Sequence, residues 1–406
     1  MTVPIYLKIV ADENIPFARE AFGTLGEVTL RPGRSLTAAQ AAGAELLFVR
    51  SVTKVNAALL DGTRVRFVGS ATAGTDHVDL DYVARRGLGF ASAPGSNANS
   101  VGEYMAAAWL TIAARRGARL DGLRVGIIGA GNTGSRVEEK ARALGMAPVL
   151  NDPPLARQTG DPKYRPLGEL FACDIVTCHT PLTHEGPDAT YHLADDEFFE
   201  RLKPGAWFCN AGRGQVVDTT ALLNAIDSGR LGAVVLDVWE QEPRVSARLL
   251  EKVTVATPHV AGYSYDGKVR GTEMVYAAAC RFLGVEPRWT MQAALPPNSN
   301  LIKVSATGRA PEAAYATKRS FVQATRSVAT DEGALHEIVS QLCPVERDDE
   351  ALRQAITLTP DERGTLFDRL RKEYPQRREF PTARVRLEGA SDALRAKVRA
   401  LGFRLL

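Results

Sequence analysis

The sequence predicts an α/β protein with two doubly wound parallel sheets and a small α+β domain at its C-terminus. Over the first 290 residues, short apolar runs typical of strands alternate with helical stretches. Such alternation indicates parallel sheets with helices on their faces. Within it, a glycine-rich turn joins a strand to a helix. Beyond Pro287 the alternation weakens and charged residues become denser, which predicts a separate small domain.

The composition favours a globular, cytoplasmic protein. The 406 residues suffice for two or three domains, and 45% are hydrophobic and 24% charged, as in ordinary globular chains. The 50 basic and 47 acidic residues leave a net charge of +3. This bias is too weak for nucleic acid or a membrane surface to be the expected partner. Neither a secretory leader nor a membrane-spanning apolar run is recognised.

The cysteines and histidines lack the spacing of metal ligands. The five cysteines form no Cys-x-x-Cys pair, so they are predicted to be buried, reduced thiols, as in a cytoplasmic protein. The six histidines show no ligand spacing either, and no metal is predicted.

The first domain is expected over residues 1–96. Its predicted strands are residues 5–10, 27–30, 46–49, 65–70 and 90–92, and its predicted helices are residues 16–22, 37–42, 56–60 and 78–85. Two loops that follow strands, residues 50–54 and 71–76, are richer in polar side chains than a scaffold requires. Ligands of open α/β sheets bind beyond the carboxyl ends of strands, although capping of the next helix by Ser and Thr would also explain these loops.

A turn and a long helix are expected to lead into the second domain, residues 97–263. Residues 94–97, Pro-Gly-Ser-Asn, form a turn signal. Ser100 and Glu103 then have the spacing of a capping box. A helix is therefore predicted from Ser100 to about Arg115.

The second domain is organised around a glycine fingerprint. A strand at residues 124–128 is followed by Gly129-x-Gly131-x-x-Gly134 and a helical stretch at residues 135–144. In a dinucleotide site the first glycine makes a tight turn, the second admits the pyrophosphate and the third lets the helix pack closely. The pyrophosphate would lie at the helix N-terminus, where N–H groups are unpaired. The alternative is that these glycines form a tight turn that binds no dinucleotide.

Asp152 indicates which dinucleotide is bound. It ends the next predicted strand, residues 147–151, where an acidic residue of the fingerprint is expected. Its carboxylate would accept hydrogen bonds from a ribose diol and repel a 2′-phosphate. The sequence therefore predicts NAD rather than NADP as the cofactor.

Three charged residues follow the next strands of this domain. The predicted strands are residues 175–178, 206–210, 233–236 and 253–256. Arg213 follows the second of them, Glu242 the third and His259 the fourth. Since parallel strands end at one edge of the sheet, these side chains are expected to collect there.

This set of side chains suits oxidation of a 2-hydroxy acid. The planar charged fork of Arg213 can hold a carboxylate in a bidentate manner. His259 is the expected base, because the histidine side chain titrates near pH ~6.5. Glu242 would orient the imidazole and stabilise its protonated form. Each residue alone also fits an ordinary loop or salt-bridge role, and their joint placement favours catalysis.

Four motifs resemble the D-isomer-specific 2-hydroxyacid dehydrogenase family. They are Gly129-x-Gly131-x-x-Gly134, Asn210-Ala211-x-Arg213-Gly214, Asp237-Val238-Trp239-Glu240-x-Glu242-Pro243 and Pro258-His259-x-Ala261-Gly262. The resemblance covers about residues 5–290. It implies two Rossmann-like domains, with residues 264–290 returning to a substrate-binding domain and residues 97–263 binding NAD.

Further matches resemble one branch of this family, which acts on a phosphorylated 2-hydroxy acid. They lie at residues 12–14, 50–56, 71–79, 236–240, 259–263, 347–349 and 377–379. Carried over by residue, the resemblance implies Arg213 and Glu242 as catalytic and His259 as the proton donor or acceptor. It implies substrate contacts from Ser51, Thr72 and Tyr263. It implies NAD contacts from Asn132, Thr133, Asp152, Thr180, Ala211, Gly212, Asp237 and Gly262.

Residues 291–406 are expected to form the small C-terminal domain. Strands are predicted at residues 301–305, 383–387 and 403–406, and helices at residues 313–329, 334–342 and 391–401. The resemblance implies that this domain makes a homodimer; a regulatory or merely solvated appendage is the alternative.

The expected reaction is NAD-dependent oxidation of 4-phospho-D-erythronate to 3-hydroxy-2-oxo-4-phosphooxybutanoate, a step of pyridoxal 5′-phosphate biosynthesis. The 2-hydroxy acid follows from the three charged residues, whereas the phosphate follows from the resemblance. Arg50 and Lys54 are candidate phosphate ligands, or else solvated surface charges. Alternatives are phosphoglycerate dehydrogenase, another 2-hydroxyacid dehydrogenase, or an NAD-sensing module of the corepressor kind.

Overall fold

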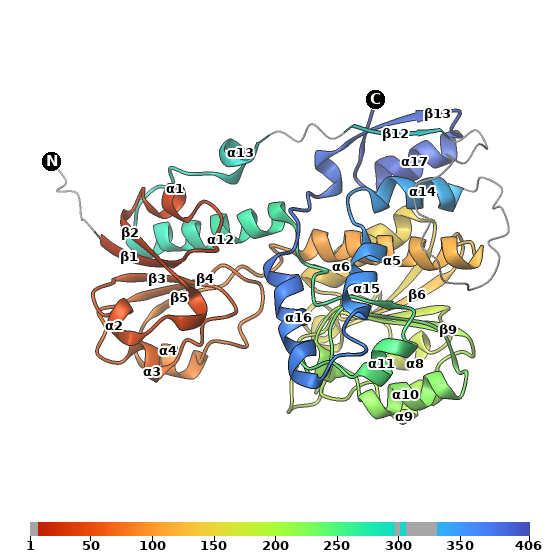
Figure 1. The fold of residues 1–406 in the computed structure, drawn as a ribbon, viewed down its shortest axis with the longest axis horizontal. Helices are drawn as coiled ribbons and strands as arrows, with labels where there is room; N and C mark the ends of the chain where they lie inside the picture. The colour runs from red at the N-terminus through yellow and green to blue at the C-terminus, as the bar shows by residue number, and fades with distance from the viewer. Residues whose placement is uncertain (1–6, 297–300, 306–330) are drawn as a thin grey trace. The chain divides into compact units, whose positions relative to one another are not determined.

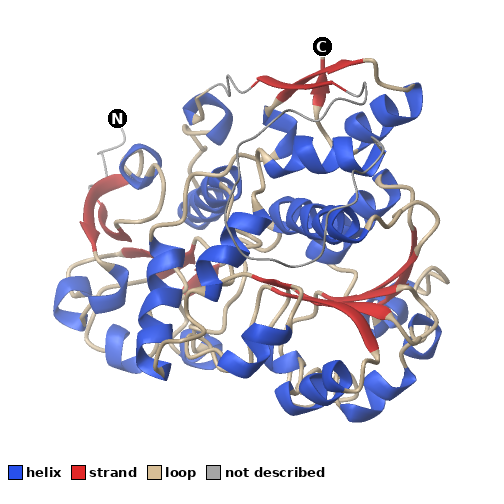
Figure 2. Ribbon diagram, turned by 45° about the vertical axis from the view of Figure 1, so that its right-hand side comes forward, coloured by secondary structure: helices blue, strands red, loops and turns tan. Residues whose placement is uncertain are grey.

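A computed structural model describes residues 7–296, 301–305 and 331–406. The chain divides into two compact units, residues 1–98 with 263–297 and residues 99–262 with 298–406. Each unit contains a parallel sheet with helices on both faces (Figures 1 and 2). The predicted fold class is confirmed. The division into domains at residues 1–96 with 264–290, 97–263 and 291–406 stays a prediction.

The first unit is built on a five-stranded sheet in the order β2-β1-β3-β4-β5. Its central strands β3 and β4 are buried on both sides, as their continuous apolar runs predict. Helices α1 and α12 cover one face, and α3 and α4 cover the other (Figure 1). The bounds are β1 Leu7–Asp12, α1 Ala18–Phe22, β2 Gly26–Arg31, a 3-10 turn Gly33–Ser35, α2 Ala38–Ala41, β3 Leu46–Val49, α3 Ala57–Leu60, β4 Phe67–Ser70, α4 Leu80–Arg85, β5 Gly89–Ala91, α12 Tyr265–Leu283 and α13 Met291–Ala294.

The second unit contains a six-stranded parallel sheet in the order β11-β10-β9-β8-β6-β7. The strand order reverses beside β6, so a ligand crevice is expected at the carboxyl ends of β6 and β8. The bounds are α5 Ala98–Arg116, β6 Arg124–Ile128, α6 Asn132–Ala143, β7 Ala147–Asn151, α7 Pro153–Thr159, α8 Leu167–Leu170, β8 Ile175–Cys178, α9 Asp196–Arg201, β9 Ala206–Asn210, a 3-10 turn Gly214–Val216, α10 Thr219–Asp227, β10 Leu231–Leu236, α11 Ala247–Lys252 and β11 Val255–Ala256.

The C-terminal segment adds a second, smaller parallel sheet to this unit, in the order β12-β13-β14. The bounds are β12 Leu301–Ser305, α14 Asp331–Ser340, α15 Val345–Arg353, α16 Pro360–Lys372, a 3-10 turn Phe380–Thr382, β13 Arg384–Glu388, α17 Asp392–Ala400 and β14 Arg404–Leu405. The helix expected at residues 313–329 lies outside the described residues. Helices α15 and α16 had not been predicted, because charged residues obscure their apolar stripes.

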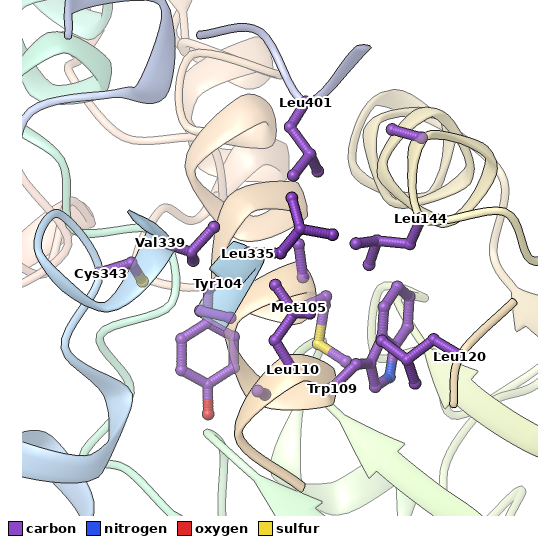
Figure 3. Close-up of a cluster of buried hydrophobic side chains, with 14 of the residues drawn as sticks. Tyr104, Met105, Trp109, Leu110, Leu120, Leu144, Leu335, Val339, Cys343 and Leu401 are labelled. Carbon is purple, nitrogen blue, oxygen red and sulfur yellow. The ribbon is translucent and has the colours of Figure 1, made fainter. Parts of the chain in front are cut away.

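Helix α5 is buried along most of its length, between the large sheet and the C-terminal segment. Tyr104 and Trp109 are fully buried. They belong to one apolar cluster with Leu335 and Val339 of α14 and with Leu401 (Figure 3). The C-terminal segment therefore completes the core around this helix.

The predicted capping box at Ser100 and Glu103 is wrong. Helix α5 begins two residues earlier, at Ala98, so both side chains lie inside it. Ser100 Oγ donates instead to Glu379 Oε1 at 2.9 Å. Glu103 Oε1 accepts from the Phe380 N–H at 2.8 Å. The two polar side chains that suggest a cap therefore bind residues of a distant segment, Glu379 and Phe380.

The five cysteines are all free and buried, as predicted. Among the helices of the described ranges, none combines the length and apolarity that crossing a membrane requires.

Candidate active site

The glycine turn after β6 leaves room for a dinucleotide. Gly129 has φ of +83°, and a Cβ there would lie 2.8 Å from the His179 carbonyl carbon. A Cβ on Gly134 would lie 1.9 Å from the Gly129 carbonyl oxygen. These two glycines therefore allow the turn and the close approach of α6. A Cβ on Gly131 would meet nothing within 4 Å, so this position opens into free space.

The N-terminus of α6, which begins with Asn132 and Thr133, fits an anion. Its N-cap residue is Gly131, which has no side chain to accept a capping hydrogen bond. The nearby Thr180 Oγ1 and His179 Nδ1 are buried without a hydrogen-bond partner among the described residues. Burial lowers the pKa of His179 to about 3, so its imidazole is neutral. Unpaired helix N–H groups and an unused hydroxyl are what a bound pyrophosphate dinucleotide would satisfy.

Asp152 supports the glycine turn as well as offering an acceptor. Its Oδ2 accepts from the Ala130 N–H at 2.9 Å, and its Oδ1 accepts from the Leu155 N–H at 3.0 Å, which caps α7. Each carboxylate oxygen has more than one lone pair, so both can still accept from a ribose diol. The sequence predicted the acceptor but not this structural role.

The loop after β9 is fixed from within by Asn210. This residue is 1% exposed; its Nδ2 donates to the Arg213 carbonyl oxygen at 2.9 Å, and its Oδ1 accepts from the Gly212 N–H at 3.0 Å. The Ala211 N–H donates to the Cys178 carbonyl oxygen. The loop that presents Arg213 is therefore anchored to the ends of two strands.

Gly214 holds this loop against the one after β10. A Cβ on Gly214 would lie only 1.9 Å from the Trp239 carbonyl oxygen, an approach that no larger residue permits. Trp239 in turn donates its N–H to Glu242 Oε1 at 2.9 Å. The loops of Arg213 and Glu242 are thereby packed together.

Glu242 and His259 form a hydrogen-bonded pair. His259 Nδ1 and Glu242 Oε2 are 2.8 Å apart. Burial, the largest single influence, would raise the pKa of Glu242, but the positive charge and hydrogen bond of His259, the Trp239 N–H and the charge of Arg371 together lower it. Glu242 is therefore an anion beside the imidazole. This is the arrangement in which a carboxylate orients a catalytic histidine.

Asp237 holds the backbone that carries His259. It is 1% exposed. Its Oδ1 accepts from Thr257 Oγ1 and from the Val260 N–H, both at 2.7 Å, and its Oδ2 accepts from the Ala261 N–H at 3.0 Å. Its own carbonyl oxygen accepts from the His259 N–H at 2.7 Å. The predicted NAD contact of Asp237 stays a prediction beside this observed role.

The conformation of His259 needs such support. Its φ is 57°, in the left-handed region that is unfavourable for a side chain with a Cβ. Tyr104 contributes from α5, because its hydroxyl lies 2.7 Å from Thr257 Oγ1. Trp239 Nε1 donates to the Thr257 carbonyl oxygen at 3.0 Å. Sequence reasoning placed Asn210 in the motif of Arg213 but gave it no role. It missed Thr257 and Tyr104 as parts of the site, since neither belongs to one of the four motifs.

The three predicted substrate contacts lie in the first unit. Ser51 is exposed after β3. Thr72 follows β4, and its Oγ1 lies 2.9 Å from Ser70 Oγ. Tyr263 precedes α12, with Lys268 Nζ 4.5 Å from its ring centroid. Their part in substrate binding stays a prediction, as does that of Gly262 in binding NAD. Among the described residues, no group of three or more His, Cys, Asp or Glu is placed to hold a metal ion.

The Glu242→Gln substitution is expected to move the acidic limb of the pH–rate profile for oxidation to lower pH. A carboxylate favours the imidazolium form of its neighbour. Proton acceptance needs the neutral form, so removing the charge lets His259 work at lower pH. Steady-state rates measured across pH check this.

Glu240→Gln is the matched control for that measurement. Glu240 lies on the same loop and is 2.7 Å from a different histidine, His192. Its substitution should leave the limb in place. A limb that stays put in Glu242→Gln as well, or moves to higher pH, would contradict the coupling of Glu242 to His259.

Comparison with known proteins identifies the class of the fold. Residues 97–261 match the family model of the D-isomer specific 2-hydroxyacid dehydrogenase NAD binding domain, and residues 317–402 match a domain of unknown function. The D-lactate dehydrogenase of Aquifex aeolicus, solved with NAD and lactic acid, is 26% identical with a TM-score of 0.55, covering 68% of this chain and 96% of its own. The chain thus has the fold and the NAD-binding domain of an NAD-dependent 2-hydroxyacid dehydrogenase.

Two relatives narrow the class further. The erythronate-4-phosphate dehydrogenase of Salinibacter ruber is 48% identical over 92% of this chain and 92% of its own length. That of Edwardsiella ictaluri is 44% identical over 98% of this chain and 99% of its own. The chain belongs to the erythronate-4-phosphate dehydrogenase family.

Proposed function

We propose that this protein oxidises 4-phospho-D-erythronate to 3-hydroxy-2-oxo-4-phosphooxybutanoate with NAD, a step of pyridoxal 5′-phosphate biosynthesis. The observation that carries the proposal is the hydrogen-bonded pair of His259 and Glu242 at 2.8 Å, on loops packed beside the loop of Arg213. The names of the relatives supply the substrate.

The residues divide the chemistry among them. Arg213 holds the substrate carboxylate and polarises the oxygen on C2. His259 accepts the proton of the C2 hydroxyl while the C2–H bond breaks, and Glu242 stabilises the imidazolium that forms. Bound NAD supplies the acceptor for the hydride from C2. Loss of the hydroxyl proton to His259 and of the hydride from C2 would together leave a carbonyl at C2.

Substrate choice is the direct test of this proposal. Rates with NAD are measured for 4-phospho-D-erythronate, 3-phosphoglycerate and D-lactate. We expect 4-phospho-D-erythronate to have by far the highest kcat/KM. Comparable rates on all three would overturn the substrate assignment, and binding of NAD without turnover of any of them would identify a sensing module instead.

Asp152→Ala is expected to weaken the preference for NAD over NADP. The carboxylate favours a ribose diol and repels a 2′-phosphate, so its loss removes the discrimination. The measurement is the ratio of kcat/KM for the two cofactors. A wild-type protein that used NADP as well as NAD would contradict the assignment.

Asp195→Ala is the control for the loss of stability that Asp152→Ala causes by removing a helix cap. Asp195 caps α9 through the Phe198 N–H at 2.9 Å, as Asp152 caps α7. Loss of either cap costs about 1 kcal/mol of stability, but the Asp195 variant should keep the wild-type cofactor ratio.

We also propose that the protein forms a homodimer and lies in the cytoplasm. The resemblance of residues 347–349 and 377–379 to a C-terminal domain that makes homodimers supports the first. Five free, buried cysteines support a reducing compartment. Light scattering on the full chain would show twice the 43.8 kDa of one chain if the homodimer forms.

A further inference from the structure

The loop that carries His259 leaves a very short strand. We use the name catalytic loop for residues 257–262. It follows β11, whose two residues pair with β10, Val255 with Val235 and Ala256 with Leu236. Strand β11 is at the edge of the sheet. Such a short edge strand gives little support to a loop in which His259 has a left-handed backbone.

Helix α15 binds the outer side of this strand. Asp349 is 3% exposed, and its Oδ1 accepts from the Ala256 N–H at 2.8 Å. The same oxygen accepts from Arg353 Nε at 3.0 Å. Arg353 also donates to the carbonyl oxygens of Leu250 at 2.8 Å and Val253 at 2.7 Å. Asp349 of the C-terminal segment thus accepts the hydrogen bond from the Ala256 N–H, a backbone group at the sheet edge that a further strand would otherwise bind.

Arg377 binds the catalytic loop from a second direction. It is 5% exposed, and its Nη2 donates to the carbonyl oxygens of Ala261 and Ser100, both at 2.9 Å. Its Nη1 lies 3.0 Å from Cys343 Sγ, beside the buried part of α5 shown in Figure 3. Ala261 is therefore held at both backbone groups, since its N–H donates to Asp237.

We infer that Asp349 and Arg377 are positioning residues for the reaction: the C-terminal segment holds the catalytic loop so that His259 stays paired with Glu242. Neither residue touches the reacting atoms. The inference rests on the proposed function only in calling this loop catalytic. All of these contacts form within one chain, so the role is separate from any part that the segment plays in a dimer.

Arg377→Met tests the inference, because it keeps most of the apolar volume and removes both donors. A small misplacement of a catalytic group costs up to about 10²-fold in rate, so we expect kcat to fall by about 10- to 100-fold, with NAD affinity within about twofold of wild type. Weaker pairing with Glu242 should also move the acidic limb of the pH–rate profile to lower pH. A variant with unchanged kcat and limb would overturn the inference.

Hydrogen exchange provides a readout that does not depend on turnover. The amides of His259, Val260 and Ala261 should exchange at least about tenfold faster in Arg377→Met than in wild type, because opening of the loop becomes easier. If the wild type oxidised none of the substrates, the proposed function would fail while this measurement still decided the role of Arg377. Unchanged exchange would count against that role.

Asp349 supplies an independent pair of variants if Arg377→Met does not fold. Asp349→Asn keeps a carbonyl acceptor for the Ala256 N–H, and Asp349→Leu removes it. We expect Asn to retain most of kcat and Leu to lose it, with faster exchange of the loop amides. Equal kcat in the two variants would contradict the positioning role.

Thr359→Ala is the matched control. Thr359 caps α16 in the same segment, through the Glu362 N–H and the reciprocal Glu362 side chain, and its side chain bonds to this residue of its own helix. It should lower stability without changing kcat or the pH limb. Light scattering accompanies each assay; a loss of kcat that appeared only with dissociation, and was restored at high protein concentration, would assign the effect to assembly and overturn the inference.

Discussion

The His259→Asn variant is expected to lose about 10²–10⁴-fold in kcat for oxidation, the usual contribution of a positioned acid–base group. The asparagine has no group that takes up a proton near neutral pH, although it fits the same space. NAD affinity should remain close to wild type, because the dinucleotide cradle is built on β6 and α6. Steady-state kinetics and a direct NAD titration measure the two effects separately.

His184→Asn is the control for this substitution. His184 is exposed in the same unit, where its ring lies 4.9 Å from that of Tyr191. Its replacement should leave kcat unchanged. If His259→Asn retained more than a tenth of the wild-type kcat, another group would have to accept the proton.

Arg213→Lys is expected to lower kcat/KM by about 10²–10³-fold. This is comparable to the loss in other enzymes when one hydrogen-bond donor to the transition state is removed. Lysine keeps the charge but offers a single point of attachment in place of a planar fork. Both a higher KM and a lower kcat should result, because the same group binds the carboxylate and polarises the developing carbonyl.

Arg248→Lys is the matched control for Arg213. Arg248 makes an exposed ion pair with Asp227 at 2.8 Å on the surface of the same unit, and such pairs contribute little. Kinetic constants should be those of the wild type. An Arg213→Lys enzyme with a normal kcat/KM would show that the carboxylate is held by another residue.

The parallel-sheet architecture could be predicted because it depends on local patterns. Strands β3, β6, β7, β8 and β9 have the predicted bounds, since each is a short apolar run ended by a glycine or polar turn. Strand β12 also has its predicted bounds. The glycine fingerprint was equally local: the free space at Gly131 and the tight approach at Gly134 concern residues a few positions apart.

The pairing of His259 with Glu242 could also be predicted, because both residues follow neighbouring parallel strands. The supports of that pair could not. Tyr104 reaches Thr257 across 153 positions and Arg377 reaches Ala261 across 116, and a single sequence gives no sign of such distant pairs. The wrong capping box at Ser100 has the same cause, since its true partner, Glu379, lies 279 positions away.

The apolar cluster around α5 has a consequence for the order in which the molecule is made. Tyr104 and Trp109 emerge from the ribosome long before Leu335 and Leu401, which complete their surroundings. Burying one such side chain contributes about 1.5–3 kcal/mol, so the nascent chain carries an apolar surface that residues 331–406 later cover. Domains whose cores stay open in this way are vulnerable to aggregation during synthesis. Since Arg377 belongs to the same segment, we expect the site to become active only after residues 331–406 have been synthesised and have folded onto α5.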